Sequence, residues 1–76
     1  NKSIVGATFF SKRTVNLFYK NVKFVPDGFI AFCISNEVSK IILSLYPDSK
    51  IIIRIAEYPT VKEMIKLVIA APEFVA

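Results

Sequence analysis

The sequence predicts a small α+β domain, a two-layer sandwich in which helices pack on a mixed or antiparallel sheet. Three observations predict it. Short apolar runs rich in β-branched residues are typical of strands, the segments between them carry apolar residues at helical spacing, and a Pro-Asp-Gly turn separates two apolar runs. With 76 residues the chain is long enough for one domain, so we expect residues 1–76 to form a single small domain. A first residue other than methionine suggests a fragment of a longer chain.

The first strand is expected at Ser3 to Phe10, a run of β-branched and aromatic residues in which Gly6 indicates a bulge or a close approach of another backbone. The next segment, Ser11 to Tyr19, fits two patterns. Its apolar residues recur at helical spacing, but some of them also alternate as they would in a strand. We favour a short helix capped by Ser11. A strand here would instead make the N-terminal half a meander.

A hairpin is expected around Pro26-Asp27-Gly28. Proline presets its own φ, aspartate hydrogen-bonds nearby backbone, and glycine accepts a positive φ, so these three residues favour a tight turn. Val22 to Val25 has an extended pattern before the turn, and Phe29 to Ile34 is apolar after it. The sequence therefore predicts two antiparallel strands here.

The next two elements are a helix and a strand. Asn36 to Leu45 has one apolar stripe, begins at Ser35 or Asn36 as the cap, and ends before Pro47, which disfavours helix at the preceding residue. Lys50 to Glu57 is apolar at nearly every position and is expected to form the next strand.

The last helix is expected to begin at Thr60, which with Glu63 forms a capping-box pattern, and to end at Pro72. Its predicted core stripe consists of Val61, Met64, Ile65 and Val68. The second half of the helix is apolar all round, which a solvated helix does not tolerate. We therefore expect a protein interface that includes Leu67, Ile69 and Phe74.

Taken together, the elements follow the order β-α-β-β-α-β-α. The first six elements of this order match the split β-α-β arrangement of ferredoxin-like domains, with an extra C-terminal helix.

Composition argues against an enzyme. The chain has no histidine, a single cysteine and no glycine-rich phosphate loop, so we expect no catalytic residue, metal site or cofactor. Cys33 lies in an apolar run, which favours a buried hydrophobic role. One cysteine cannot form an internal disulfide, and no secretory leader or long apolar span is visible. These features predict a cytoplasmic protein without a membrane segment.

Two functions remain. The first is an interaction module that self-associates or binds a partner protein, because a hydrophobic content of 54% exceeds what so small a core can bury. The alternative is nucleic-acid binding by the N-terminal third, since residues 1–25 contain five basic residues and no acidic one. In this alternative, phosphates would be contacted by Lys12, Arg13, Lys20 and Lys23, and Tyr19 would stack on a base.

Overall fold

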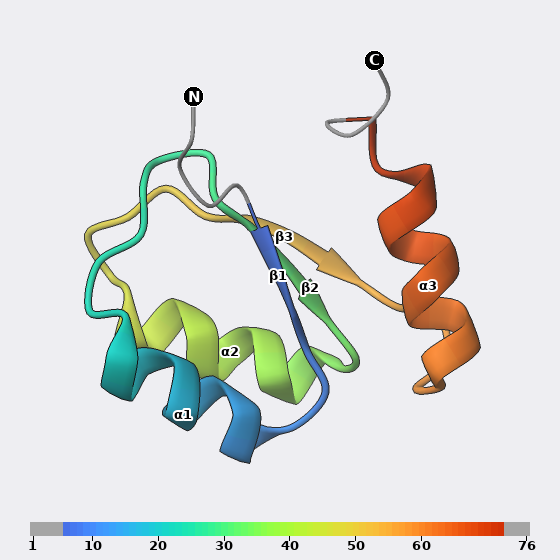
Figure 1. The fold of residues 1–76 in the computed structure, drawn as a ribbon, viewed down its shortest axis with the longest axis horizontal. Helices are drawn as coiled ribbons and strands as arrows, with labels where there is room; N and C mark the ends of the chain where they lie inside the picture. Colours follow the sequence, from blue (N-terminus) through green and yellow to red (C-terminus); the bar gives the residue numbers. More distant parts are fainter. Residues whose placement is uncertain (1–5, 73–76) are drawn as a thin grey trace.

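The computed structural model describes residues 6–72, in which helices and strands alternate along the chain (Figure 1). The elements are β1 (Gly6–Phe9), α1 (Lys12–Asn21), β2 (Ile30–Cys33), α2 (Asn36–Leu45), β3 (Ile52–Ile55) and α3 (Val61–Ala70). A small domain of helices and strands is thus confirmed. The predicted β-α-β-β-α-β-α order is not confirmed, because the described residues follow β-α-β-α-β-α.

The described strands form one parallel sheet in the order β1-β2-β3. Ala31 in the central strand lies opposite Ala7 on one side and Ile53 on the other. The helices α1 and α2 carry the chain from the end of one strand back to the end of the sheet where the next strand begins, which is the connection that parallel strands require. The prediction of a mixed or antiparallel sheet is therefore wrong.

The error arises at the Pro26-Asp27-Gly28 turn. The turn itself forms: Gly28 has a φ of 88°, and the Phe29 N–H donates to the Pro26 carbonyl at 3.1 Å. However, residues 22–26 before it have no regular secondary structure and form no strand. The turn therefore carries the chain from α1 into β2 and does not fold one strand back on another.

Contacts with a distant loop hold this turn in place. The Gly28 N–H donates to the Lys50 carbonyl at 2.7 Å, and the Lys50 N–H donates to the Asp27 carboxylate at 3.1 Å. Turn residues can tie two loops together as readily as they can close a hairpin, because their local chemistry is the same in both cases.

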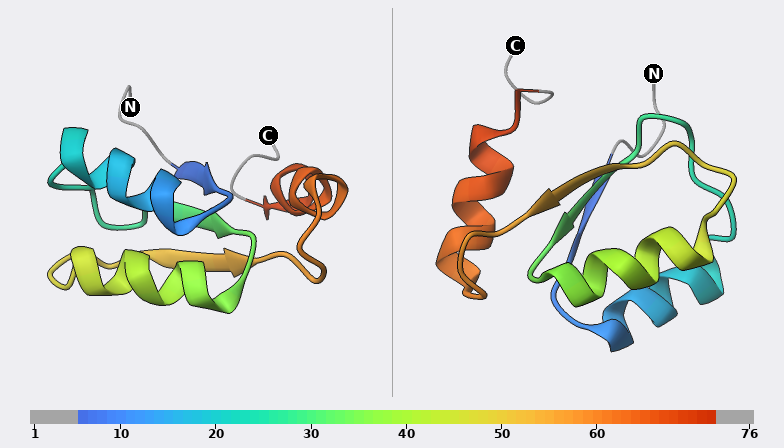
Figure 2. Two further views of the ribbon diagram at one scale, coloured as in Figure 1. Left: turned by 90° about the horizontal axis from the view of Figure 1, so that it is seen from below. Right: turned by 180° about the vertical axis from the view of Figure 1, so that it is seen from behind.

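Helices cover both faces of the sheet (Figure 2). Ala31 and Cys33 of β2 point into a core shared with α1 and α2, whereas Ile30 and Phe32 point into a second core with α3. Successive side chains of a strand face opposite sides, so β2 is buried on both. The expected two layers are thus three, with the sheet in the middle.

Each helix begins after a hydroxyl residue that accepts a hydrogen bond from a backbone N–H of the first turn. These pairs are Ser11 with Thr14 at 3.1 Å, Ser35 with Val38 at 3.4 Å, and Thr60 with Glu63 at 3.2 Å. The predicted helix at Ser11 to Tyr19 is confirmed, and the helix at Asn36 to Leu45 has its expected bounds. The caps explain why these bounds could be predicted locally.

Candidate interaction surfaces

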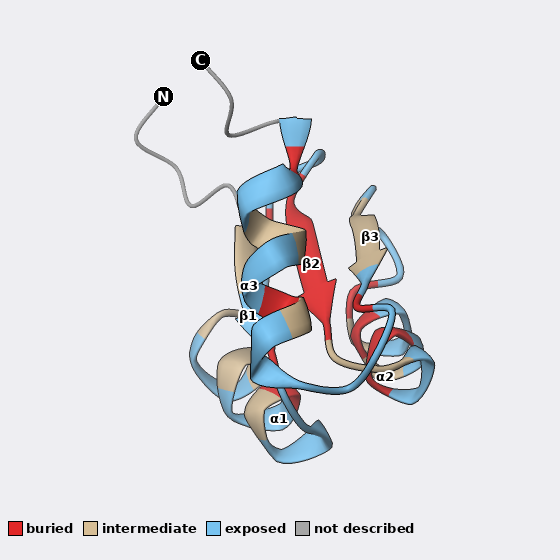
Figure 3. Cartoon of the chain, turned by 90° about the vertical axis from the view of Figure 1, so that its right-hand side faces the viewer, coloured by how far each residue is buried: buried red, intermediate tan, exposed pale blue. Residues whose placement is uncertain are grey.

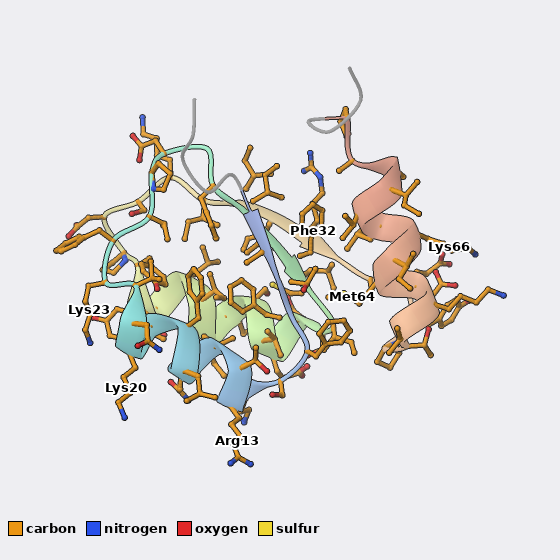
Figure 4. The ribbon with its side chains drawn as sticks, viewed as in Figure 1. Arg13, Lys20, Lys23, Phe32, Met64 and Lys66 are labelled. Atoms are coloured by element: carbon orange, nitrogen blue, oxygen red, sulfur yellow. The ribbon has the colours of Figure 1, made fainter. Side chains whose placement is uncertain are left out.

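The helix α3 has two apolar rows of side chains, and the sheet buries only one of these rows. Met64 is 1% exposed and faces β2, where Leu67 and Val68 pack beside it (Figure 4). By contrast, Val61, Ile65 and Ile69 are 60%, 53% and 71% exposed. These three residues, spaced four apart, form a row along the outer side of the helix that we call the α3 ridge.

The predicted core stripe of this helix is therefore half wrong. Met64 and Val68 do face the core, but Val61 and Ile65 belong to the α3 ridge. Lys62, Glu63 and Lys66 define a charged side of the helix. At about 100° per residue, Met64 and Val68 lie opposite that side, whereas Ile65 and Ile69 lie beside Lys62 and Lys66. The charged residues of the helix were therefore the signal that favours Met64 and Val68 as the buried row.

The three residues predicted for a protein interface differ in how far the structure exposes them. Ile69 is the most exposed residue of the α3 ridge, whereas Leu67 packs partly against the core formed with β2. Phe74 lies outside the described residues. Sequence reasoning missed Val61 and Ile65 as surface residues because it assigned them to the core.

A groove runs between α3 and the neighbouring edge of the sheet. This α3–β1 groove has a volume of about 270 Å³ and is lined by Thr8, Phe10, Met64, Ile65, Val68 and Ile69. Figure 3 shows α3 in front of the sheet, with exposed residues along its outer side. No charged side chain lines the groove, so it suits an apolar ligand surface and has no acid–base chemistry.

The groove adjoins the outer edge of β1. The Phe9 carbonyl accepts from the Ile34 N–H at 3.1 Å, so Phe9 directs its backbone groups towards β2. Backbone groups alternate in direction along a strand, and those of Thr8 therefore point away from the sheet. Within residues 6–72, no strand pairs with this edge.

The basic side chains form a second surface on α1. Lys12, Arg13 and Lys20 are exposed, and Figure 4 shows Arg13 and Lys20 pointing away from the body of the protein. Lys23 follows the helix and is also exposed. The helix contains no acidic residue, so its solvent-facing side carries an uncompensated positive charge. We call these four residues the α1 basic face.

The predicted stacking residue, Tyr19, is engaged by protein groups. Its ring meets the Tyr46 ring edge-on with centroids 5.2 Å apart, and the Lys23 ammonium lies 4.2 Å from its centroid. A base stacking on that side of Tyr19 would have to displace Lys23. The neighbouring Phe24 is 88% exposed, so its ring is open to a stacking base. Its exposure could have been expected from the sequence, because Phe24 lies in a loop beside the Pro26-Asp27-Gly28 turn.

Two titratable groups in the core, Cys33 and Tyr46, have pKa values that burial raises. Cys33 is fully buried, and burial raises the pKa of its thiol to about 11, which keeps it protonated and unreactive at neutral pH. Burial, with a smaller effect of Tyr19, also raises the pKa of Tyr46, whose hydroxyl donates to the Val22 carbonyl. Among residues 6–72, no cluster of histidine, cysteine, aspartate or glutamate could hold a metal ion.

No protein-family model, curated protein or solved structure matches this chain. Within the described part of the chain, no helix has both the length and the apolarity needed to cross a bilayer.

Proposed function

We propose that this protein is a small non-enzymatic interaction module that binds a protein through the α3 ridge and the α3–β1 groove. The observation that carries the proposal is the α3 ridge itself, three large aliphatic side chains exposed in a row on a helix whose other side is already buried. Phe10, 40% exposed at the end of β1, extends this apolar surface across the groove.

The energetics favour a covered surface. Fully burying a side chain of this size contributes about 1.5–3 kcal/mol, so covering the three half-exposed residues of the α3 ridge would supply a few kcal/mol. Single exposed apolar residues are common on monomers, but a contiguous apolar row beside an apolar groove marks an interaction site. The groove lacks charged groups, which agrees with a binding role and not with a catalytic one.

Site-specific photo-crosslinking in living cells tests the proposal. A photoreactive amino acid at Ile69 should give protein adducts, because the partner would lie on that side chain. The control position is Leu43, which is 46% exposed on α2 and lies away from the groove. Adducts at Ile69 and not at Leu43 support the proposal, and the absence of any protein adduct at Ile69 overturns it.

A second candidate function is nucleic-acid binding through the α1 basic face. Three exposed cations on a helix without an acidic residue, and Lys23 just after it, favour a polyanionic ligand. A cationic helix face also occurs on proteins that bind no nucleic acid, so this candidate ranks second. It uses a different surface from the α3 ridge, and the two functions are compatible.

The salt dependence of binding tests this second candidate. The double variant Lys12→Ala/Arg13→Ala should reduce the slope of log K against log salt by roughly 1.4 for a single-stranded probe, about 0.7 for each lost phosphate contact. The control variant Lys40→Ala/Lys62→Ala removes the same charge from exposed positions on α2 and α3. Equal slopes for the two variants, or no binding at low salt, would exclude the α1 basic face.

A further inference from the structure

We infer that the partner bound at the α3–β1 groove is an extended segment of another protein, which adds a fourth strand to the outer edge of β1. This inference rests on the proposed function and adds the chemistry of the partner. The backbone of the segment pairs with β1, and its apolar side chains, at alternate positions, fill the groove. An acidic residue of the segment lies near Lys62.

The backbone of β1 selects an extended partner. The Ile34 N–H donates to the Phe9 carbonyl at 3.1 Å, so Phe9 uses its backbone groups within the sheet. Thr8 is exposed, and it directs its own N–H and carbonyl away from β2. Within residues 6–72, no strand pairs with these groups. A helix bonds its backbone groups internally, whereas a strand offers a donor and an acceptor at every second residue.

The position of α3 leaves room for one more strand. Figure 3 shows α3 in front of β1 and β2, with β3 to one side. Met64 is buried in the core formed with β2, whereas Ile65 and Ile69 line the groove together with Thr8 and Phe10. The described sheet therefore ends at β1, while α3 still has apolar side chains to cover on that side.

The spacing of strands places the added segment beneath these side chains. Neighbouring strands lie about 4.8 Å apart, so a strand paired with β1 would run directly beside Thr8. Every second side chain of that strand would face the same side of the sheet as Thr8, towards Ile65 and Ile69. No charged side chain lines the groove, which has a volume of about 270 Å³, so the residues that enter it should be aliphatic.

The edge of β1 lacks the features that keep sheet edges free. From Gly6 to Phe10 the chain contains no charged residue and no proline, which natural proteins use to prevent pairing at exposed edges. The opposite edge strand, β3, contains Arg54. Of the two edge strands, β1 is therefore the one whose sequence permits pairing.

Charge at the rim of the groove selects an acidic flank. Lys62 and Lys66 are exposed on α3 and neighbour Ile65 and Ile69. The Glu63 carboxylate lies 3.4 Å from the Lys66 ammonium, and among the described residues Lys62 has no acidic partner. A carboxylate beside the apolar residues of the segment would complement this charge. Added salt should therefore weaken binding.

Peptide selection tests the inference without knowledge of the natural partner. A library of random linear peptides displayed on phage is the probe, and the purified chain is the bait. Peptides that also bind Ile65→Asp, which places a charge in the groove, are discarded. The remaining peptides should share apolar residues at every second position and an acidic residue next to them. Apolar residues at helical spacing, or no enriched peptide, overturn the inference.

Two variants at one position then test the backbone pairing. Thr8→Pro removes an N–H that points away from β2, so the hydrogen bonds between β1 and β2 remain. It should weaken binding of the selected peptide by about tenfold or more, whereas Thr8→Ala keeps the N–H and should have a much smaller effect. Titration calorimetry measures both, and circular dichroism shows whether each variant is folded. Equal binding by the two folded variants overturns the inference.

N-methylation of the selected peptide gives a second readout that leaves the protein unchanged. Only every second amide of an added strand faces β1. Methyl groups on these amides should abolish binding, and methyl groups on the amides between them should not. An effect without this period of two contradicts strand addition.

The free protein and the photoprobe separate the remaining outcomes. A Thr8 amide that exchanges as slowly as the amides of β2 in the free protein shows that this chain or a second copy already covers the edge, and overturns the inference. Failed peptide selection with protein adducts at Ile69 in cells disproves strand addition and keeps the interaction module. Failure of both disproves both.

Discussion

At the scale of single residues, Gly6 shows how closely β1 approaches its neighbour. A Cβ atom at this position would lie 2.8 Å from the Ile30 carbonyl oxygen and 3.3 Å from the Ile30 Cβ. A carbonyl of the central strand cannot move aside without disturbing the ladder on both of its sides. The close approach expected from a glycine within a strand is therefore present, and it is a steric requirement.

Gly6→Ala should lower the free energy of unfolding by about 1–3 kcal/mol, the usual cost of forcing a methyl group into a packed site. Urea denaturation measures the change. Gly28→Ala is the comparison, because its Cβ would meet no atom within 4 Å and only the φ of 88° opposes it. If Gly6→Ala is as stable as the wild type, the close approach of β1 to β2 is wrong.

Cys33 makes stability depend on alkaline pH. Burial raises the thiol pKa from 9.0 to about 11, so between these values the unfolded chain releases a proton that the folded chain retains. The contribution of Cys33 to the free energy of unfolding should therefore be constant below pH 9 and fall by roughly 2–3 kcal/mol as pH rises to 11. Tyr46, whose pKa is also raised, acts in the same direction.

Urea unfolding at pH 8 and pH 10.5 measures this fall. The variant Cys33→Ala lacks the thiol and should show a smaller decrease, with the remainder due to Tyr46 and other groups. An equal decrease in both proteins would show that the thiol ionises as easily in the folded state as in the unfolded one.

At the scale of secondary-structure elements, α3 is the element whose bounds and orientation have separate causes. Thr60 caps it, and Pro59 and Pro72 flank it, so its extent depends on local chemistry. Its orientation depends on which apolar row the sheet buries. Met64 lies against Ile30 and Phe32 of β2 in that second core, which leaves the neighbouring row exposed as the α3 ridge.

Substitutions at adjacent positions of α3 should therefore differ sharply. Met64→Ala should cost about 2–5 kcal/mol, as other buried truncations do. Ile65→Ala should cost at most about 0.5 kcal/mol in dilute solution, because a surface change away from special features has little effect. Thermal unfolding at micromolar concentration compares them. Equal losses would mean that the helix is rotated relative to the sheet.

At the scale of the whole molecule, β2 is the element on which both cores depend. It pairs with a strand on each side and is buried on both faces. The described helices therefore all pack against the sheet of which β2 is the central strand. The edge strands have no comparable protection, since β3 is only partly buried and, within residues 6–72, no strand pairs with the outer side of β1. Local opening should therefore begin at the edges.

Amide hydrogen exchange checks this order of protection. The amides of Ala31 and Phe32 should exchange only through global unfolding, at rates that follow the free energy of unfolding in urea. The outward-pointing Thr8 amide should exchange faster by orders of magnitude. Fast exchange in β2 would contradict its central position.

The sequence by itself determined where the helices begin. Ser11, Ser35 and Thr60 cap helices through hydrogen bonds within four residues, and Pro26-Asp27-Gly28 forms its turn through its own backbone preferences. Interactions of this range are encoded in neighbouring residues. Nothing in the same pattern shows whether the turn closes a hairpin or joins a loop to Lys50.

Only the tertiary structure decided the strand direction and how much of α3 stays exposed. Both depend on competition among apolar surfaces for the two faces of one small sheet. The helices α1 and α2 occupy one face, α3 buries a single row on the other, and the remaining apolar row is left outside. Because a sheet of short strands has too little area to cover both apolar rows of α3, the proposed interaction surface results from this geometry.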